Sequence, residues 1–118
     1  MTTIIGAGLS GLLTGYLLKK KGVPFKLLEA RTRVGGRINT LYETNQAPLE
    51  MGATWFTQQH RHVLGLLEEL GIEYFEQRMD TTVFYETSTD APVQVVQIPS
   101  QAPSFRISGG TSSLIRVY

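Results

Sequence analysis

The sequence of 118 residues contains no cysteine, so neither a disulfide framework nor a thiolate nucleophile can be built from it. Its 11 basic and 10 acidic residues leave a formal charge of +1, which predicts no attraction to nucleic acid or to an anionic membrane. No apolar run is long enough to span a bilayer. The first apolar segment begins at residue 2, and we therefore expect no signal peptide and a cytoplasmic protein.

Histidine is scarce as well, which argues against a metal centre. His60 and His62 are the two histidines, and no third ligand of suitable type lies near them in the sequence. We expect both to be surface residues and predict no metal site. A content of 42% apolar and 18% charged residues suits one modest globular domain.

Glycine is plentiful, and the strongest signal in the chain is a G-x-G-x-x-G turn at residues 6–11. Residues 2–5 before it are predicted to form a strand buried on both faces, and leucines at helical spacing follow it up to the lysines at 19–21. Residues 25–28 are predicted as a second strand, which ends at Glu29. Strand, glycine turn, helix, strand and acid form the context that a dinucleotide-binding βαβ unit requires.

Each residue type in this unit has a physical reason. Gly6 permits the turn, Gly8 permits close approach to a pyrophosphate, and Gly11 permits close packing of helix on sheet. The helix N-terminus directs N–H groups at phosphates. A carboxylate at Glu29 can accept hydrogen bonds from ribose hydroxyls but would repel a 2′-phosphate, which argues against an NADP-type ligand.

Three arginines and a Gly-Gly pair follow the acid within residues 30–37. Their guanidinium groups can bind phosphate or carboxylate bidentately. The alternative interpretation is a solvated basic turn.

The two segments IIGAGLSGL and LLEARTRVGGRINT together resemble the flavin-containing amine oxidase superfamily. This group includes monoamine and polyamine oxidases and shares its FAD domain with protoporphyrinogen oxidases and carotenoid desaturases. Its E-A-x-x-R-x-G-G-R signature is matched by Glu29, Ala30, Arg33, Gly35, Gly36 and Arg37. The resemblance implies FAD as cofactor, with Glu29 at the adenosine ribose, Arg31 near the adenosine end, and Gly36 and Arg37 along the pyrophosphate and flavin side. It implies a further phosphate contact for Ser10.

Two later segments resemble the same family. Residues 49–56 are similar to its l-x-x-G-[GA]-x-W segment, where small residues let the backbone pass the flavin ring, although Met51 departs from the usual glycine or leucine. Core packing is the alternative role for Trp55. Residues 105–114 resemble a G-G-[ST]-x-x-L turn, which predicts a helix with Thr111 or Ser112 as its N-cap, anchored by Leu114 and Ile115. A generic loop is the alternative there.

The resemblance and the fingerprint together define the predicted cofactor-binding set. It comprises Gly6, Ala7, Gly8, Leu9, Ser10, Gly11, Glu29, Ala30, Arg31, Gly35, Gly36, Arg37, Gly52, Ala53, Thr54 and Trp55. No catalytic residue is predicted.

Between these motifs, residues 60–70 are predicted to form an amphipathic helix that Gly71 closes, with Glu68 and Glu69 on a solvated face. Residues 72–76, 81–86 and 93–98 are predicted strands, the last two forming an antiparallel pair. The predicted fold class is α/β, a Rossmann-type FAD-binding βαβ unit plus a small antiparallel β segment. We expect residues 1–118 to be the N-terminal part of an FAD domain, a fragment of a larger two-domain enzyme without its substrate domain and C-terminal FAD segment. A shortened stand-alone relative of that enzyme is the alternative.

The function implied by resemblance is hydride transfer from a small-molecule amine to FAD in the full enzyme, with this chain alone inactive. A protoporphyrinogen oxidase or carotenoid desaturase-like enzyme with the same FAD domain is one alternative. Another is a non-catalytic nucleotide-binding module, in which residues 93–98 would pair with a second copy of the chain.

Overall fold

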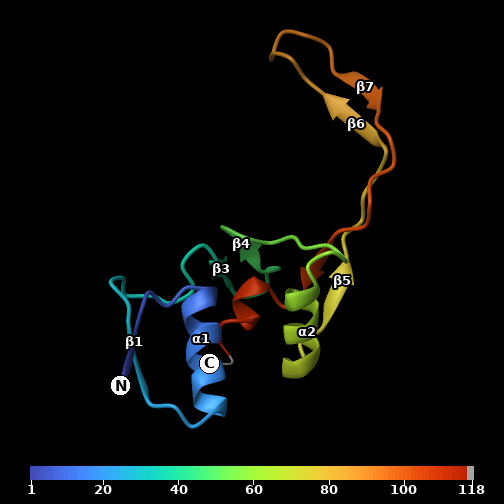
Figure 1. Ribbon diagram of the computed structural model, residues 1–118. Helices are drawn as coiled ribbons and strands as arrows, with labels where there is room; N and C mark the ends of the chain where they lie inside the picture. The colour runs from blue at the N-terminus through green and yellow to red at the C-terminus, as the bar shows by residue number, and fades with distance from the viewer. Residues whose placement is uncertain (117–118) are drawn as a thin grey trace.

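The computed structural model describes residues 1–116 and shows a packed body from which one hairpin extends (Figure 1). The long axis measures 62 Å against 29 and 27 Å for the other two, and the radius of gyration is 18.6 Å. A compact domain of similar length would have a radius of gyration of about 13 Å. The projecting hairpin accounts for this extended shape.

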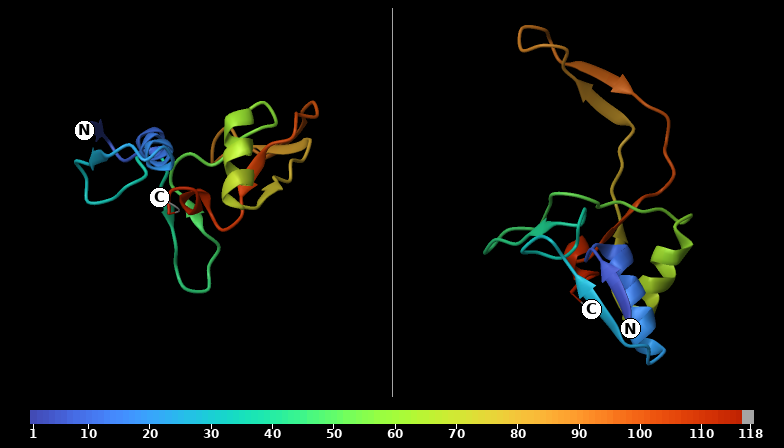
Figure 2. Two further views of the ribbon diagram at one scale, coloured as in Figure 1. Left: turned by 60° about the horizontal axis from the view of Figure 1, so that its bottom comes forward. Right: turned by 60° about the vertical axis from the view of Figure 1, so that its left-hand side comes forward.

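The N-terminal half is a βαβ unit, as predicted. Strand β1 (Thr2–Ile5) leads through the glycine turn into helix α1 (Leu9–Lys20), and strand β2 (Phe25–Leu28) returns parallel to β1, with Ile4 opposite Leu27. Figure 2 (right) shows the two strands side by side with α1 against one face. A Cβ at Gly15 would lie only 2.8 Å from the Phe25 ring, which confirms the predicted close contact between helix and sheet.

The prediction that β1 is buried on both faces is wrong. Ile4, which faces α1, is buried, whereas Ile5 on the opposite face is 86% exposed. Within residues 1–116 this sheet has two strands, β1 and β2, and a single helix against it. One helix covers only one face of a sheet, so the alternate residues of β1 stay in solvent.

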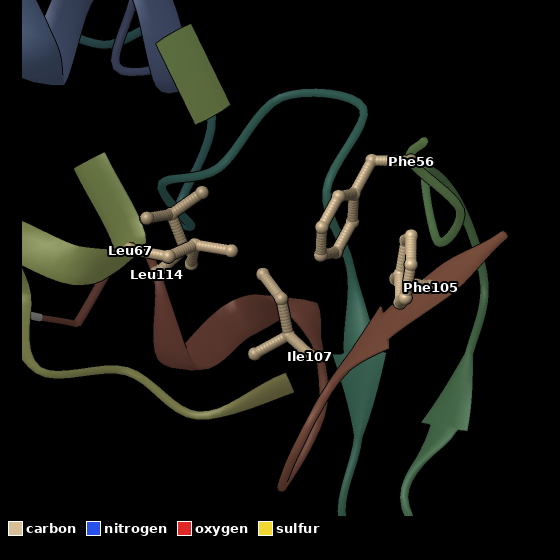
Figure 3. Packing of buried hydrophobic residues seen from close by; sticks show 5 residues of the cluster. All are labelled: Phe56, Leu67, Phe105, Ile107 and Leu114. Carbon is tan, nitrogen blue, oxygen red and sulfur yellow. The ribbon is translucent and has the colours of Figure 1, made fainter. Parts of the chain in front are cut away.

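The C-terminal half packs around one apolar cluster. Helix α2 (Arg61–Leu70) ends at Gly71 in the left-handed conformation, as predicted, and strand β5 (Tyr74–Glu76) pairs antiparallel with β8 (Phe105–Ile107). Figure 3 shows the five buried side chains of this cluster pointing toward one another: Phe56, Leu67, Phe105, Ile107 and Leu114.

The projecting hairpin continues the β5–β8 pair. Strands β6 (Thr82–Tyr85) and β7 (Gln94–Gln97) pair antiparallel with Phe84 opposite Val95, which confirms the predicted strand pair. Phe84 is 72% and Val95 62% exposed, because the hairpin stands away from the body (Figure 1). It has solvent on both faces.

A short arm joins the two halves. It consists of strands β3 (Thr40–Leu41) and β4 (Leu49–Glu50) around a turn at Asn45, and it contacts the 3-10 helix η1 (Thr111–Ser113). The predicted N-cap role of Thr111 or Ser112 is wrong, because Gly110 precedes η1 and both hydroxyl side chains bond to the arm instead. Leu114 and Ile115 are buried, as predicted. Residues 117–118, toward which the predicted helix would continue, lie outside the described residues.

A polar contact also connects the two α-helices. Glu69 on α2 accepts hydrogen bonds from Lys20 Nζ and Tyr16 Oη on α1, both at 2.6 Å. The hydrogen bond from Lys20 lowers the pKa of the Glu69 carboxyl. Glu69 is exposed, as predicted for this face, but it also ties the βαβ unit to the C-terminal half.

Candidate cofactor cleft

The glycine turn presents the N-terminus of α1 to solvent. Gly6 has φ +94°, Gly8 is the N-cap, and neither a capping side chain nor an acidic residue occupies the first turn. The first N–H groups of a helix have no intrahelical partner, so those of residues 9–11 are available to an external acceptor. This end of α1 therefore suits an anion.

Glu29 ties this turn to the loop after β2. Its Oε2 accepts the Ala7 N–H at 2.7 Å, and its Oε1 accepts the Arg31 N–H at 2.9 Å. These two backbone hydrogen bonds, that from Ala7 foremost, lower the pKa of the Glu29 carboxyl, which is therefore ionised at neutral pH. Each carboxylate oxygen has a second lone pair, so Glu29 can still accept hydrogen bonds from a ligand.

The loop at residues 30–37 is folded by its own contacts. The Gly35 N–H donates to Ala7 O at 2.7 Å, and the Arg33 guanidinium donates to Gly36 O at 2.9 Å and Ile38 O at 3.3 Å. Gly35 and Gly36 both have positive φ, which permits this tight path. Within residues 1–116 the Arg31 and Arg37 guanidinium groups make no hydrogen bond, so these two cations are available to an anionic ligand.

The arm supplies the opposite wall through a backbone ladder. The Met51 N–H donates to Asn39 O at 2.8 Å, and the Ala53 N–H donates to Arg37 O at 3.1 Å. A Cβ at Gly52 would overlap the Arg37 carbonyl group. Position 52 therefore requires glycine, because the two sides of the arm approach each other too closely there for a side chain.

These elements enclose an open cleft of about 1160 Å³. It brings together twelve of the predicted residues: Gly6, Gly8, Leu9, Ser10, Gly11, Glu29, Arg31, Gly35, Gly36, Arg37, Gly52 and Ala53. Four predicted residues do not line it. Ala7 is buried and donates its N–H to Glu29. The residues Ala30 and Thr54 are not part of the lining. Trp55 is 68% exposed elsewhere on the surface, so the alternative prediction that Trp55 packs in the core is wrong. Flavin contact for Trp55 stays a prediction.

Sequence reasoning missed five residues that also line the cleft: Ile5, Arg33, Ile38, Asn39 and Met51. Arg33 is the first arginine of the E-A-x-x-R-x-G-G-R signature, and its place in this motif could have identified it. The others are adjacent in sequence to predicted residues, and which of them face the cleft depends on the pairing across the arm.

Two further features of the described residues bear on the class of site. Among residues 1–116, no group of three or more histidine, cysteine or acidic side chains could hold a metal ion. Neither helix in this part of the chain has the length and apolarity needed to cross a membrane.

Comparison with known proteins identifies the family. The model of the family described as flavin containing amine oxidoreductase matches residues 9–110. Flavin-containing amine oxidase B of Bos taurus is 36% identical over 73 residues, 62% of this chain and 14% of that protein. The probable polyamine oxidase 4 of Arabidopsis thaliana is 31% identical over 85 residues, 70% of this chain and 17% of that protein.

Solved structures agree with this result. A structure of putrescine oxidase with putrescine bound aligns with a TM-score of 0.67 at 34% identity, covering 85% of this chain and 22% of that one. The chain thus spans about a fifth of that structure and 14% of the amine oxidase B sequence. The family's flavin agrees with the predicted FAD, and the α/β fold class is confirmed. With its glycine turn, acid and Gly-Gly loop gathered at one cleft, the chain belongs to the flavin containing amine oxidoreductase family.

Proposed function

We propose that this chain binds FAD and forms the N-terminal part of the FAD domain of an amine-oxidising enzyme. The observation that carries the proposal is the convergence of an uncapped helix N-terminus, an ionised carboxylate and two free guanidinium groups on one cleft. This combination suits a dinucleotide, because the helix N-terminus and the cations face a diphosphate and the carboxylate can bind a ribose hydroxyl.

The residues present fit this cofactor. The backbones of Gly8 and Gly36 face each other so closely that a Cβ at Gly36 would lie 3.2 Å from Gly8 Cα, which leaves a narrow floor made only of backbone. We propose that the backbone N–H groups of residues 9–11, together with the Ser10 side chain, bind the diphosphate. We propose that Glu29 accepts hydrogen bonds from the adenosine ribose. Arg37, Gly52 and Ala53 would then lie toward the flavin.

The reaction proposed for the full enzyme is hydride transfer from a small-molecule amine. Flavin, when bound, supplies the two-electron acceptor for this chemistry. The names of the similar proteins, amine oxidases and a putrescine oxidase, favour an amine over a porphyrinogen or a carotenoid as substrate class. The proposed role of this chain is to bind and orient the cofactor in the cytoplasm. It contributes no catalytic residue and is inactive alone.

Flavin retention tests the proposal. The purified chain is incubated with FAD, freed of excess ligand, and its bound flavin is quantified by visible absorbance. We expect near-stoichiometric retention by the unaltered chain. Glu29→Gln is expected to bind FAD roughly 10 to 100 times more weakly, because it loses charge-assisted hydrogen bonds.

Glu43→Gln is the matched control, since Glu43 lies on the arm's exposed turn away from the cleft lining. It should retain FAD like the unaltered chain. A folded chain that retains no flavin would contradict the proposed function. An equal loss of FAD affinity in Glu29→Gln and Glu43→Gln would contradict the role of Glu29.

We also propose that the chain self-associates through β7. Residues 93–98 are uncharged, and Pro92 and Pro99 flank them. An isolated two-stranded hairpin is marginally stable in water, and an unprotected strand edge pairs readily with another strand. Two copies of β7 paired antiparallel about a two-fold axis would form a four-stranded sheet, with each acidic hairpin tip directed toward the other copy's body. Residues 80–98 carry a charge of −3, and the rest of the chain, with all 11 basic residues, carries +4.

Replacing Val95 with lysine is expected to abolish this association, because each copy would place a charge on the shared strand. Sedimentation velocity over a hundredfold concentration range should show a dimer for the unaltered chain and a monomer for V95K. Leu17→Lys, at an exposed position of α1, is the control that should still dimerise. A monomeric unaltered chain at every concentration would rule this proposal out.

A further inference from the structure

Glu50 sits at the centre of a hydrogen-bond network that the cofactor proposal does not use. Its Oε1 accepts the Thr111 N–H at 2.5 Å and the Thr111 hydroxyl at 3.1 Å, and its Oε2 accepts the Thr40 hydroxyl at 2.8 Å. Thr40 and Ser112 complete the network through the bonds Thr40 N to Ser112 Oγ at 3.0 Å and Ser112 N to Thr40 Oγ1 at 2.9 Å.

This network joins two segments far apart in the sequence. Thr40, Thr111 and Ser112 are all buried, and the bonds that run from the arm to η1 span 61 to 72 positions. The two hydrogen bonds between Thr40 and Ser112 are therefore screened from water, where leaving a group unpaired is costly, and the bonds to the half-buried Glu50 are partly screened. The network holds the arm to the C-terminal segment.

The arm in turn forms one wall of the cleft. The pairs Thr40–Glu50 and Leu41–Leu49 in β3 and β4 continue directly into the ladder of Met51 N to Asn39 O and Ala53 N to Arg37 O. Residues 37–39 and 51–53 line the cleft, whereas the glycine turn and Glu29 line its other part. A contact that fixes residues 40 and 50 thus fixes the position of the wall formed by residues 37–39 and 51–53. It does not act on the wall formed by the glycine turn and Glu29.

We propose that Glu50 is a positioning residue that holds the arm wall of the cleft in place for the part of FAD beyond the ADP moiety. This inference rests on the proposed function. Glu50 does not line the cleft itself, so its effect on the cofactor passes through the backbone of residues 51–53.

The donor pattern around Glu50 defines which substitutions break the network. The Thr40 hydroxyl donates to Glu50 and accepts from the Ser112 N–H, so its single proton is committed to the carboxylate. An amide in Glu50→Gln offers one acceptor oxygen in place of two, and either Thr40 or Thr111 loses its acceptor. Thr40→Val has nearly the same shape without the hydroxyl, and Thr40→Ser retains it.

The experiment compares the affinities of FAD and of ADP for the chain. We expect E50Q and T40V to raise the Kd for FAD roughly tenfold, the effect of one charge-assisted hydrogen bond, and to change that for ADP less than about twofold. T40S is expected to restore the affinity for FAD, and Glu43→Gln to leave both affinities unchanged. Equal weakening of FAD and ADP would overturn the proposal, because it would indicate general destabilisation. Unchanged FAD binding in E50Q would overturn it too.

Hydrogen exchange provides a readout that does not depend on the cofactor. The Met51 and Ala53 amides are expected to exchange at least tenfold faster in E50Q, whereas the amides of α2 keep their rates. If the unaltered chain binds neither FAD nor ADP, the proposed function fails and these exchange rates alone decide the role of Glu50. Unchanged exchange at residues 51 and 53, or an E50Q chain that does not fold, would count against positioning.

Discussion

Replacing Gly11 with alanine is expected to destabilise the chain by about 3 kcal/mol and to abolish FAD retention, because the added Cβ would be forced into a packed backbone. It would overlap the carbonyl oxygen of Gly6 and lie 3.4 Å from Ile4 Cγ2. Neither side can yield easily, since Gly6 belongs to the tight turn and Ile4 is the buried residue of β1. The start of α1 would have to move away from the strand.

This displacement would affect both folding and binding. The helix N-terminus that we propose for the diphosphate would no longer face the cleft in the same position. Urea denaturation followed by circular dichroism measures the stability, and the visible absorbance of retained flavin measures the binding.

Gly65→Ala is the matched control for this substitution. Gly65 lies within α2, and a Cβ there would meet no atom within 4 Å. Alanine is the better helix former, so this variant is expected to gain roughly 0.5 to 1 kcal/mol of stability and to bind FAD normally. If G11A were as stable as G65A, the close packing of α1 on β1 would be disproved.

Shortening Leu67 to alanine is expected to remove 2 to 5 kcal/mol of stability, roughly the range for a buried leucine. Leu67 is fully buried in the cluster that joins α2 to β8, and it lies next to Leu114 at the α2 side of the cluster (Figure 3). The loss includes both the apolar transfer energy and the cavity left behind. Since small domains are stable by only about 5 to 15 kcal/mol, this single change would remove a large fraction of the total stability.

Chemical denaturation of L67A measures this effect, and Leu17→Ala serves as control. Leu17 has the same chemistry but is 46% exposed on α1, so its truncation is expected to cost less than about 1 kcal/mol. Hydrogen exchange would locate the damage in α2, β5 and β8 rather than in the βαβ unit. Similar losses for both leucines would show that the cluster is not the main core of this half.

Elements with a local signal were predictable from the sequence. The βαβ unit followed from helical spacing between two short apolar runs and from the glycines at 6, 8 and 11. Helix α2 followed from its amphipathic pattern and the closing Gly71, and the β6–β7 pair followed from valine and aromatic residues on either side of a turn. Most of the cleft could also be predicted, since twelve of its residues lie in two short motifs and one neighbouring segment.

The sequence by itself determined the local elements and most residues of the candidate cleft, because the conformational preferences of glycine and apolar periodicity act over a few positions. Only the tertiary structure decided which faces are covered, as Ile5 and the exposed hairpin demonstrate. It also decided that Thr111 and Ser112 bond to the arm at Glu50 and Thr40 rather than cap a helix. These contacts join partners 61 to 72 positions apart, and their energy depends on the folding of the whole chain rather than on any local pattern.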